Sequence, residues 1–470
     1  MSNKGLYGSP TGRKEGSGGS ITYKNFARNF GLSPSDMGKT VTVNTSNGYN
    51  LVLPDCRQIS SQRFIVIKNV DTVNLLVTNN GGTGIKTVAP NSSVVLACTD
   101  VSTANGVWSA LAGTNLSALY VGSAATVKTT VSNITFESIC ALSPTVAVCF
   151  YSESTVNKIF ATALTISGTN ISVGGAIEVL AGSILYGASI CALDATHAIV
   201  FYSTSPNSYA YANILEVISG NITVGVQAAI HNTGVCEYQS ICALDATHAV
   251  AFYLGTSNFA QAKVITTSGN TITNVSAATT IYGSTAVKES ICALDSTHAV
   301  AFYQGAGSYA YASLLTINTS TGAITVNDTK TVYNVAATDY QSICALDSTH
   351  AVAFYQGAGS YAYANILTIS GLTIGVGATS TIESAVTAQR SICALNSTQA
   401  IGFYTDSSGY PSSNVLTISG LGITAGNKIT LNSSSASYES IAALPTTSSA
   451  IAFYRGASNY AYANVLAYTQ

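Results

Sequence analysis

The sequence predicts an all-β protein: a seven-bladed β-propeller with interlocked ring closure, preceded by a small β-sandwich or barrel domain and an N-terminal arm. Three observations lead to this prediction. A unit of about 50 residues recurs seven times. A complete unit contains four strand-like segments, which is the plan of a propeller blade. The fourth strand that the last unit lacks is found ahead of the first unit.

The repeat is clearest in the phrase SICALDSTHAVAFY at residues 290–303, which returns at residues 342–355. Small and apolar residues alternate in both halves of the phrase, and Asp, Ser, Thr and His separate them. This pattern is typical of two short strands joined by a tight turn. A Tyr-rich third segment and a TITVG-like fourth segment follow. The copies open at intervals of 49 to 52 residues, at Ser138, Ser189, Ser240, Ser290, Ser342, Ser391 and Ser440.

The ends of the repeat region favour a closed ring over an open solenoid. The seventh unit stops with YAYANVLAYTQ, after its third strand. Residues 117–122, SALYVG, match the fourth-strand pattern of residues 170–174 and 221–225, and they stand at a similar distance from the next repeated Ser. We therefore expect the strand at 117–122 to complete blade seven, within a propeller of residues 113–470. A stacked solenoid would instead need polar capping repeats.

The region ahead of the propeller divides into two parts. Residues 38–112 contain alternating segments such as TVTVNT, RFIVIKNV and SSVVLACTD, separated by Asn, Gly, Pro and Asp turns, which indicates a small β-sandwich or barrel module. Residues 1–37 form a basic, Gly/Ser-rich arm. Its five cations lack a helical pattern and aromatic partners, so docking on a protein is favoured over nucleic-acid binding.

The composition argues against several classes of protein. Only 8% of the residues are charged, the formal net charge is −2, and no apolar run reaches the length of a membrane span. The N-terminus lacks the apolar region of a secretion signal, so we expect synthesis in the cytoplasm without export. Six of the ten cysteines share one slot of the repeat, where the seventh copy has Ala442. These thiols are expected to be reduced fillers of small buried spaces, since zinc spacings are absent.

Asp194, Asp245, Asp295 and Asp347 each stand three residues before a His, a pairing that suits either a metal site or acid–base chemistry. The alternative is a structural turn in which Asp accepts backbone N–H groups. The structural interpretation is favoured because the pair becomes Asn396 with Gln399 in a later copy. Known hydrolase, nucleotide and metal motifs are absent, and a sialidase would need three arginines where the propeller has Arg390 and Arg455. We predict no enzymatic activity, no cofactor and no metal.

Tyrosine is the conspicuous residue of the propeller, since all but three of the 27 tyrosines lie there. Several units carry a Gly/Ser loop ending in Tyr between their second and third strands. A Tyr offers a flat apolar ring with a polar tip, which suits weak multivalent recognition. Alternatively, the rings pack between blades, above all the second Tyr of each Y-x-Y pair. The candidate ligand-contacting residues are Tyr209, Tyr309, Tyr361, Tyr410 and Tyr460.

The phrases A-L-D-x-T-H-A-V-A-F-Y and L-T-I-S-G resemble Tyr/Ser/Gly-rich propeller repeats in virion-associated proteins of tailed bacteriophages, over residues 117–470. Residues 38–112 resemble the small β modules of phage tail fibres. That likeness lies in the strand at 64–69, the V-x-N-x-G-G hairpin at 77–82 and the G-x-W strand at 106–108.

The resemblance implies a non-enzymatic virion component, made in the host cytoplasm. Its propeller would contact a host surface glycan or protein as part of a tail fibre or receptor-binding protein. The arm would dock on other virion proteins, and the chain would be a homo-oligomer, by family expectation a trimer, with no membrane contact. A capsid decoration or head-fibre protein with a passive propeller and a secreted lectin are the alternatives. The residues assigned to virion docking are Lys4, Arg13, Lys14, Lys24 and Arg28.

Overall fold

The computed structural model describes residues 14–15, 20–24, 30–44, 50–59, 64–70, 73–89, 92–110, 118–128, 134–182 and 184–469. Across these ranges the fold is all-β, and its only helical elements are single 3-10 turns. No helix in the described ranges is long and apolar enough to cross a membrane. The chain forms two compact units, one of Met1–Ala118 with Thr469–Gln470 and one of Leu119–Tyr468.

The first unit contains two sheets around one core. The six-stranded sheet runs in the order β1 (Lys14–Glu15), β2 (Ser20–Lys24), β4 (Thr40–Asn44), β6 (Phe64–Asn69), β9 (Ser92–Asp100) and β10 (Val107–Ala110). The four-stranded sheet runs in the order β3 (Phe30–Gly31), β5 (Leu51–Val52), β7 (Leu75–Thr78) and β8 (Gly84–Val88). The 3-10 turns η1 (Pro34–Asp36) and η2 (Cys56–Gln58) complete it. Alternate residues of the strands, such as Val41, Ile65 and Leu96, are fully buried in the common core, which also contains Trp108.

The boundary between arm and module differs from the one expected from the sequence. Strand β2 pairs in parallel with β4, and β3 pairs in parallel with β5, so residues 20–24 and 30–31 of the expected arm are strands of this unit. Local patterning cannot show such pairing between distant segments. Of the residues assigned to virion docking, Lys14 and Lys24 lie in β1 and β2. Lys4, Arg13 and Arg28 lie outside the described residues.

The second unit contains seven sheets, here called sheets 1 to 7; sheets 1 to 6 are built from strands that follow one another in the chain. Sheet 1 has β13 (Ile134–Ser143), β14 (Val146–Glu153), β15 (Lys158–Ser167) and β16 (Asn170–Ala181); sheet 2 has β17 (Ile184–Ala192), β18 (His197–Thr204), β19 (Tyr209–Ile218), β20 (Asn221–Val224) and β21 (Ala228–His231). Sheet 3 has β22 (Glu237–Ala243), β23 (His248–Leu254), β24 (Phe259–Ser268), β25 (Thr271–Val275) and β26 (Thr279–Thr285); sheet 4 has β27 (Val287–Ala293), β28 (His298–Gln304), β29 (Ala310–Asn318) and β30 (Ala323–Tyr333).

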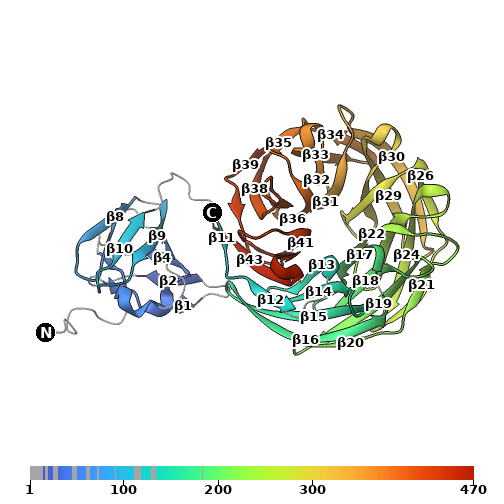
Figure 1. The fold of residues 1–470 in the computed structure, drawn as a ribbon. Helices are drawn as coiled ribbons and strands as arrows, with labels where there is room; N and C mark the ends of the chain where they lie inside the picture. The colour runs from blue at the N-terminus through green and yellow to red at the C-terminus, as the bar shows by residue number, and fades with distance from the viewer. Residues whose placement is uncertain are drawn as a thin grey trace. The chain divides into compact units, whose positions relative to one another are not determined.

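Sheet 5 has β31 (Asp339–Asp347), β32 (His350–Gln356), β33 (Ala362–Ser370), β34 (Thr373–Val376) and β35 (Ser380–Glu383); sheet 6 has β36 (Ala388–Asn396), β37 (Gln399–Thr405), β38 (Pro411–Ser419), β39 (Gly422–Ala425) and β40 (Ile429–Thr430). Sheet 7 has β41 (Ser437–Leu444), β42 (Ser449–Arg455) and β43 (Ala461–Thr469), joined by β11 (Ala118–Val121) and β12 (Ala125–Lys128). Figure 1 shows the sheets arranged around an axis, with the first strand of each sheet innermost, in the manner of a β-propeller.

The sheets differ from the expected four-stranded plan at their outer edges. In sheets 2, 3, 5 and 6 a short fifth strand from the inter-sheet connection pairs with the third strand. In sheets 1 and 4 one long fourth strand covers the same edge. Its register with the third strand shifts near the point where the other sheets have a break between two short strands. The outer edge of each third strand is therefore covered in each of these six sheets.

Two interactions recur between successive sheets. The strand alternation in the second strand directs Phe to one face and Tyr to the other, and the Phe of one sheet lies against the Tyr of the next. Phe302 and Tyr355, both fully buried, have ring centroids 6.1 Å apart. In the first strand, the hydroxyl oxygen of the repeated Ser accepts the backbone N–H of Ile in the next sheet, as between Ser290 and Ile343 at 3.2 Å.

The cysteines of the repeat fill the first strand close to the axis. All ten cysteines are free, and burial raises the pKa of Cys140, Cys292 and Cys393 to about 12. Such thiols are neutral at physiological pH and serve as small apolar side chains.

We expect the Phe302→Ala variant to lose about 3–5 kcal/mol of unfolding free energy, because it leaves a cavity between sheets 4 and 5. Urea unfolding followed by circular dichroism measures the loss. Tyr309→Ala, at a half-buried loop position, is the matched control and should lose less than half as much. Equal losses in the two variants would contradict the role given to the contact between sheets.

Candidate functional site

A pocket with a volume of about 270 Å³ lies at the axis of the second unit, where the first strands of sheets 2 to 7 begin. It is lined by the two residues that precede the repeated Ser in each of these sheets. The first residues of the pairs in sheets 3 to 7 are here called the axial ring: Tyr238, Lys288, Tyr340, Gln389 and Tyr438. The second residues are called the outer ring: Gln239, Glu289, Gln341, Arg390 and Glu439. Sheet 2 contributes only the small Gly187 and Ala188.

All five residues of the axial ring have left-handed backbone conformations. Their φ angles are 53°, 63°, 50°, 46° and 59° in chain order. Each lies at a register shift between the first and second strands of its sheet, as between Asp339 and Ser342. A bulge of this kind redirects a side chain, and a non-glycine residue in this conformation costs on the order of 1–3 kcal/mol. Five large side chains are therefore held toward the axis at a cost in stability.

Two cations lie against the aromatic rings of this site. The Nζ of Lys288 lies 5.1 Å from the ring centroid of Tyr238 and 5.4 Å from that of Tyr340, and it approaches Asp339 Oδ1 at 3.3 Å. The guanidinium of Arg390 lies 5.8 Å from the Tyr340 centroid. Burial raises the pKa of Tyr238 and Tyr340, so both phenols stay neutral at physiological pH. The amide oxygen of Gln389 accepts the backbone N–H of Tyr438 at 2.8 Å.

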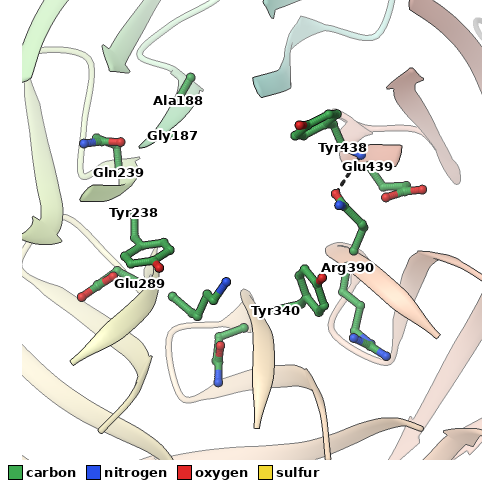
Figure 2. Close-up of a pocket in the computed structure, with 12 residues that line it drawn as sticks. Gly187, Ala188, Tyr238, Gln239, Glu289, Tyr340, Arg390, Tyr438 and Glu439 are labelled. Carbon is green, nitrogen blue, oxygen red and sulfur yellow. Dashed lines mark hydrogen bonds between the residues drawn. The ribbon is translucent and has the colours of Figure 1, made fainter. Parts of the chain in front are cut away.

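The outer ring points away from the axis. Figure 2 shows the aromatic side chains of Tyr238, Tyr340 and Tyr438 around the pocket, while Gln239, Glu289, Arg390 and Glu439 extend outward behind them. All five residues of the outer ring are buried. Several turn back to the segment before their own strand: Gln239 Nε2 donates to the Cys236 carbonyl at 2.8 Å, and Gln341 Nε2 donates to Thr338 Oγ1 at 2.9 Å.

Burial changes the charge of the outer ring. It raises the pKa of Glu289 well above its usual range and that of Glu439 to about 8, although the Thr405 hydroxyl donates a hydrogen bond to Glu439. Both carboxyl groups are therefore largely protonated at neutral pH. Burial also lowers the pKa of Arg390 to about 10, which leaves it charged. Among the residues that line the pocket, Lys288 and Arg390 therefore carry the charge at neutral pH, and both charges are positive.

The candidate tyrosines from the sequence lie at the rim of this end, and none of them lines the axial pocket. Tyr209, Tyr309, Tyr361, Tyr410 and Tyr460 are half-buried. The residue before four of them accepts a backbone hydrogen bond from the segment that leads into the next inner strand, as Ser308 does from Thr338 at 2.8 Å. That donor lies two residues before the axial ring residue. The rim tyrosines and the axial ring therefore share one end of the unit.

The second tyrosines of the Y-x-Y pairs are packing residues, which was the alternative interpretation. Tyr311, Tyr363 and Tyr462 stack on the buried tyrosines of the second strand, with ring centroids 6.0 to 6.2 Å apart. Three of the rim tyrosines follow the 3-10 turns η4 (Ala306–Ser308), η5 (Ala358–Ser360) and η6 (Ala457–Asn459), and the corresponding turn of sheet 3, η3 (Thr256–Asn258), precedes Phe259.

The Asp–His pairs lie at the opposite end of the inner strands and form turns. Asp194 Oδ1 accepts the backbone N–H groups of Thr196 and His197 at 2.7 and 2.8 Å, and its carboxylate faces His197 Nδ1 at 2.9 Å. Sheets 3 to 5 repeat this arrangement. Desolvation acts in the other direction, but these hydrogen bonds lower the pKa of the four aspartates. Among the described residues, no group of three or more His, Cys, Asp or Glu could hold a metal ion.

The axial ring is absent from the sequence-based candidates. A signal for it does exist in the chain: the letter pairs YQ, KE, YQ, QR and YE vary immediately before a Ser-Ile that stays constant. The strand of small residues stays nearly the same in every copy, whereas the pair before it varies among large polar and aromatic residues. This contrast indicates that the strand serves the structure and that the pair serves another role.

No protein-family model matches the chain, and no curated protein is a detectable sequence relative. Solved structures with similar folds include a protein from Lactobacillus plantarum, with 10% identity, a TM-score of 0.45, and coverage of 73% of this chain and 93% of that one. AofleA from Arthrobotrys oligospora matches with 12% identity, a TM-score of 0.43, and coverage of 66% and 92%. A mutant of the NanB sialidase from Streptococcus pneumoniae matches with 10% identity, a TM-score of 0.41, and coverage of 83% and 80%. Because these similarities are remote, they assign neither ligand nor activity to this chain.

The stability of the second unit should fall as the pH rises from about 5 to 8. Glu439 binds a proton in the folded state up to about pH 8 but loses it near pH 4.5 when unfolded, so the stabilisation is complete below pH 4.5 and is lost as the pH rises through the folded pKa. The loss from this residue is at most about 4 kcal/mol. Urea unfolding at several pH values measures it.

Glu439→Gln, which imitates the protonated carboxyl group, should flatten this pH profile. Glu178→Gln, at an exposed carboxylate of β16, is the control and should leave the profile unchanged. The same slope in wild type and Glu439→Gln would show that Glu439 is ionised in the folded protein.

Proposed function

We propose that the second unit is a closed, seven-bladed β-propeller in which β11 completes the last blade. The contact between repeated Ser and Ile also joins the two ends of the unit, where the backbone N–H of Ile139 donates to Ser440 Oγ at 3.1 Å. Phe453 lies 6.1 Å from Tyr151 in the same manner. Strands β11 and β12 both belong to the sheet of β43, and the amide of Asn464 donates to the Gly122 carbonyl at 2.8 Å. These contacts support an interlocked ring.

We infer that this propeller serves recognition, as the receptor-binding part of a bacteriophage particle, and that it contacts a glycan or protein of the host surface. The observation that carries the proposal is the gathering of aromatic, amide and cationic side chains from five sheets at one end of an otherwise uniform frame. The axial ring and the rim tyrosines offer flat apolar surfaces with polar tips on a rigid support, which suits repeated weak contacts.

The arrangement of titratable groups favours binding over catalysis. A glycosidase or other acid–base enzyme needs carboxyl groups that face the substrate from both sides. Glu289 and Glu439 instead extend away from the pocket into separate spaces between sheets (Figure 2). The Asp–His pairs occur once in each of sheets 2 to 5, at the end of the inner strands that lies away from the pocket. We therefore propose a non-enzymatic protein.

The proposed place on a virion rests on the resemblance of the repeats and of the N-terminal module to phage proteins. On this proposal the first unit attaches the chain to other virion proteins and brings copies together, and the propeller faces the host. The strained axial ring favours a receptor-binding role over passive decoration, since a passive propeller gains nothing from five costly side chains.

Retention of the full chain on immobilised envelope fractions from a panel of bacteria tests the recognition function. We expect at least one fraction to retain the chain, and the Tyr340→Ala, Tyr438→Ala double variant to lose at least tenfold in retention. The double variant His298→Ala, His350→Ala changes the other end and should be retained like wild type after folding is verified by circular dichroism. Retention by no fraction, or equal retention of all three proteins, would contradict the proposal.

A further inference from the structure

We propose that the axial pocket binds one carboxylated pyranose, the acidic sugar residue of a surface glycan, with its carboxylate at Lys288 and its ring against the axial tyrosines. The inference rests on the recognition function proposed above and names the chemistry of its ligand. Four features of the pocket support it: its size, its aromatic surface, its charge and its asymmetry.

The size and asymmetry suit a single sugar ring. A volume of about 270 Å³ is below the range of pockets for drug-sized ligands, which begins near 300 Å³. The large side chains come from sheets 3 to 7, whereas sheet 2 contributes Gly187 and Ala188. A Cβ on Gly187 would lie 2.7 Å from the amide oxygen of Gln239, so the glycine allows the inner strands of sheets 2 and 3 to lie close together. Among the side chains that the structure describes, the ring of large residues therefore has its gap at sheet 2.

The aromatic surface suits the apolar face of a pyranose. Tyr238, Tyr340 and Tyr438 place three rings around the pocket (Figure 2), and Gln389 adds an amide. A Tyr ring packs against the C–H groups of a sugar while its hydroxyl serves as donor or acceptor for sugar hydroxyls. The amide oxygen of Gln389 accepts the backbone N–H of Tyr438, so the NH₂ group is the part of this side chain that can donate to a ligand oxygen.

The charge of the pocket selects an anion. Lys288 is the only charged side chain of the axial ring, and the charge of Arg390 lies behind Tyr340. Nε and Nη1 of Arg390 are buried without a hydrogen-bond partner, and this guanidinium has no carboxylate ion pair in the described part of the chain to offset its charge. Burial keeps the carboxyl groups of Glu289 and Glu439 protonated, so they do not cancel these two charges at neutral pH.

The nearby carboxylates leave Lys288 able to bind a ligand. Asp339 lies 3.3 Å from its Nζ, but both side chains are about one-third exposed, and an ion pair of this kind contributes little. Glu237 precedes Tyr238 and is half-exposed. An ammonium group has three donors, so Lys288 can keep Asp339 and also donate to the carboxylate of a sugar.

Ligand-observed NMR titration of the full chain with methyl glucuronide and methyl glucoside tests the proposal. These probes differ only in a carboxylate in place of a hydroxymethyl group. We expect the glucuronide to bind with a dissociation constant on the order of 1 mM and the glucoside to bind at least tenfold more weakly. Acetate, the anion without the ring, should also bind at least tenfold more weakly than the glucuronide.

The variant Lys288→Gln should lower the affinity for the glucuronide about tenfold and leave that for the glucoside unchanged. Its fold is expected to persist, because Gln389 already occupies the same left-handed position in sheet 6. Lys330→Gln, at an exposed lysine of β30, is the matched control and should bind like wild type.

Equal binding of glucuronide and glucoside, equal binding of acetate, or an unchanged affinity in Lys288→Gln would overturn the proposal. Retention on envelope fractions separates this failure from failure of the proposed function. A chain that is retained on envelopes but binds no glucuronide refutes only the acidic sugar, whereas a chain that does neither refutes recognition as well.

Discussion

The contact on which the second unit depends is the hydrogen bond from the backbone N–H of Ile in one inner strand to the repeated Ser of the strand before it. It occurs seven times in the second unit, at 3.1 to 3.3 Å. Such a short side chain brings two backbones close together, which explains the small residues Ser, Cys and Ala in this strand. Because every pair of sheets meets in the same way, the starts of the inner strands converge on one axis. The pocket lies at this convergence.

The same contact separates the packing residues of each unit from the residues that line the pocket. From the repeated Ser onward the side chains serve packing: Cys fills the inner strand, Asp and His close the turn, and Phe and Tyr join neighbouring sheets. The bulge leaves both residues before the Ser unpaired in sheets 3, 4, 5 and 7, whereas in sheet 6 it leaves only Gln389 unpaired. They are free to differ between sheets, and they do differ. The residues that hold neighbouring sheets together are thus nearly constant, and the residues that line the axis vary.

Much of the propeller could be predicted because its signals are local. Strand alternation, the turn residues and the 49 to 52 residue spacing all lie within one unit, and the strand at 117–122 repeats a pattern found twice elsewhere. The axial ring could not be predicted in this way, because a left-handed bulge depends on the register between two strands. The parallel pairing of β2 with β4 also depends on register between distant segments, so the sequence-based boundary at residue 37 does not account for it. The loops that end in a rim tyrosine can be located from the sequence, although Tyr209 already begins β19. Sequence alone cannot show that a different set of tyrosines lines the axis.

The central claim is that the axial side chains are kept at strained positions for what they bind. Comparing the unfolding free energies of Tyr340→Gly and Tyr340→Ala tests it most directly, because both variants remove the ring and differ only in backbone freedom. At an ordinary strand position Ala is the more stable of the two. The account predicts that the Gly variant is more stable by about 1 kcal/mol and that neither variant binds host envelope like wild type. An Ala variant at least as stable as the Gly variant would contradict it.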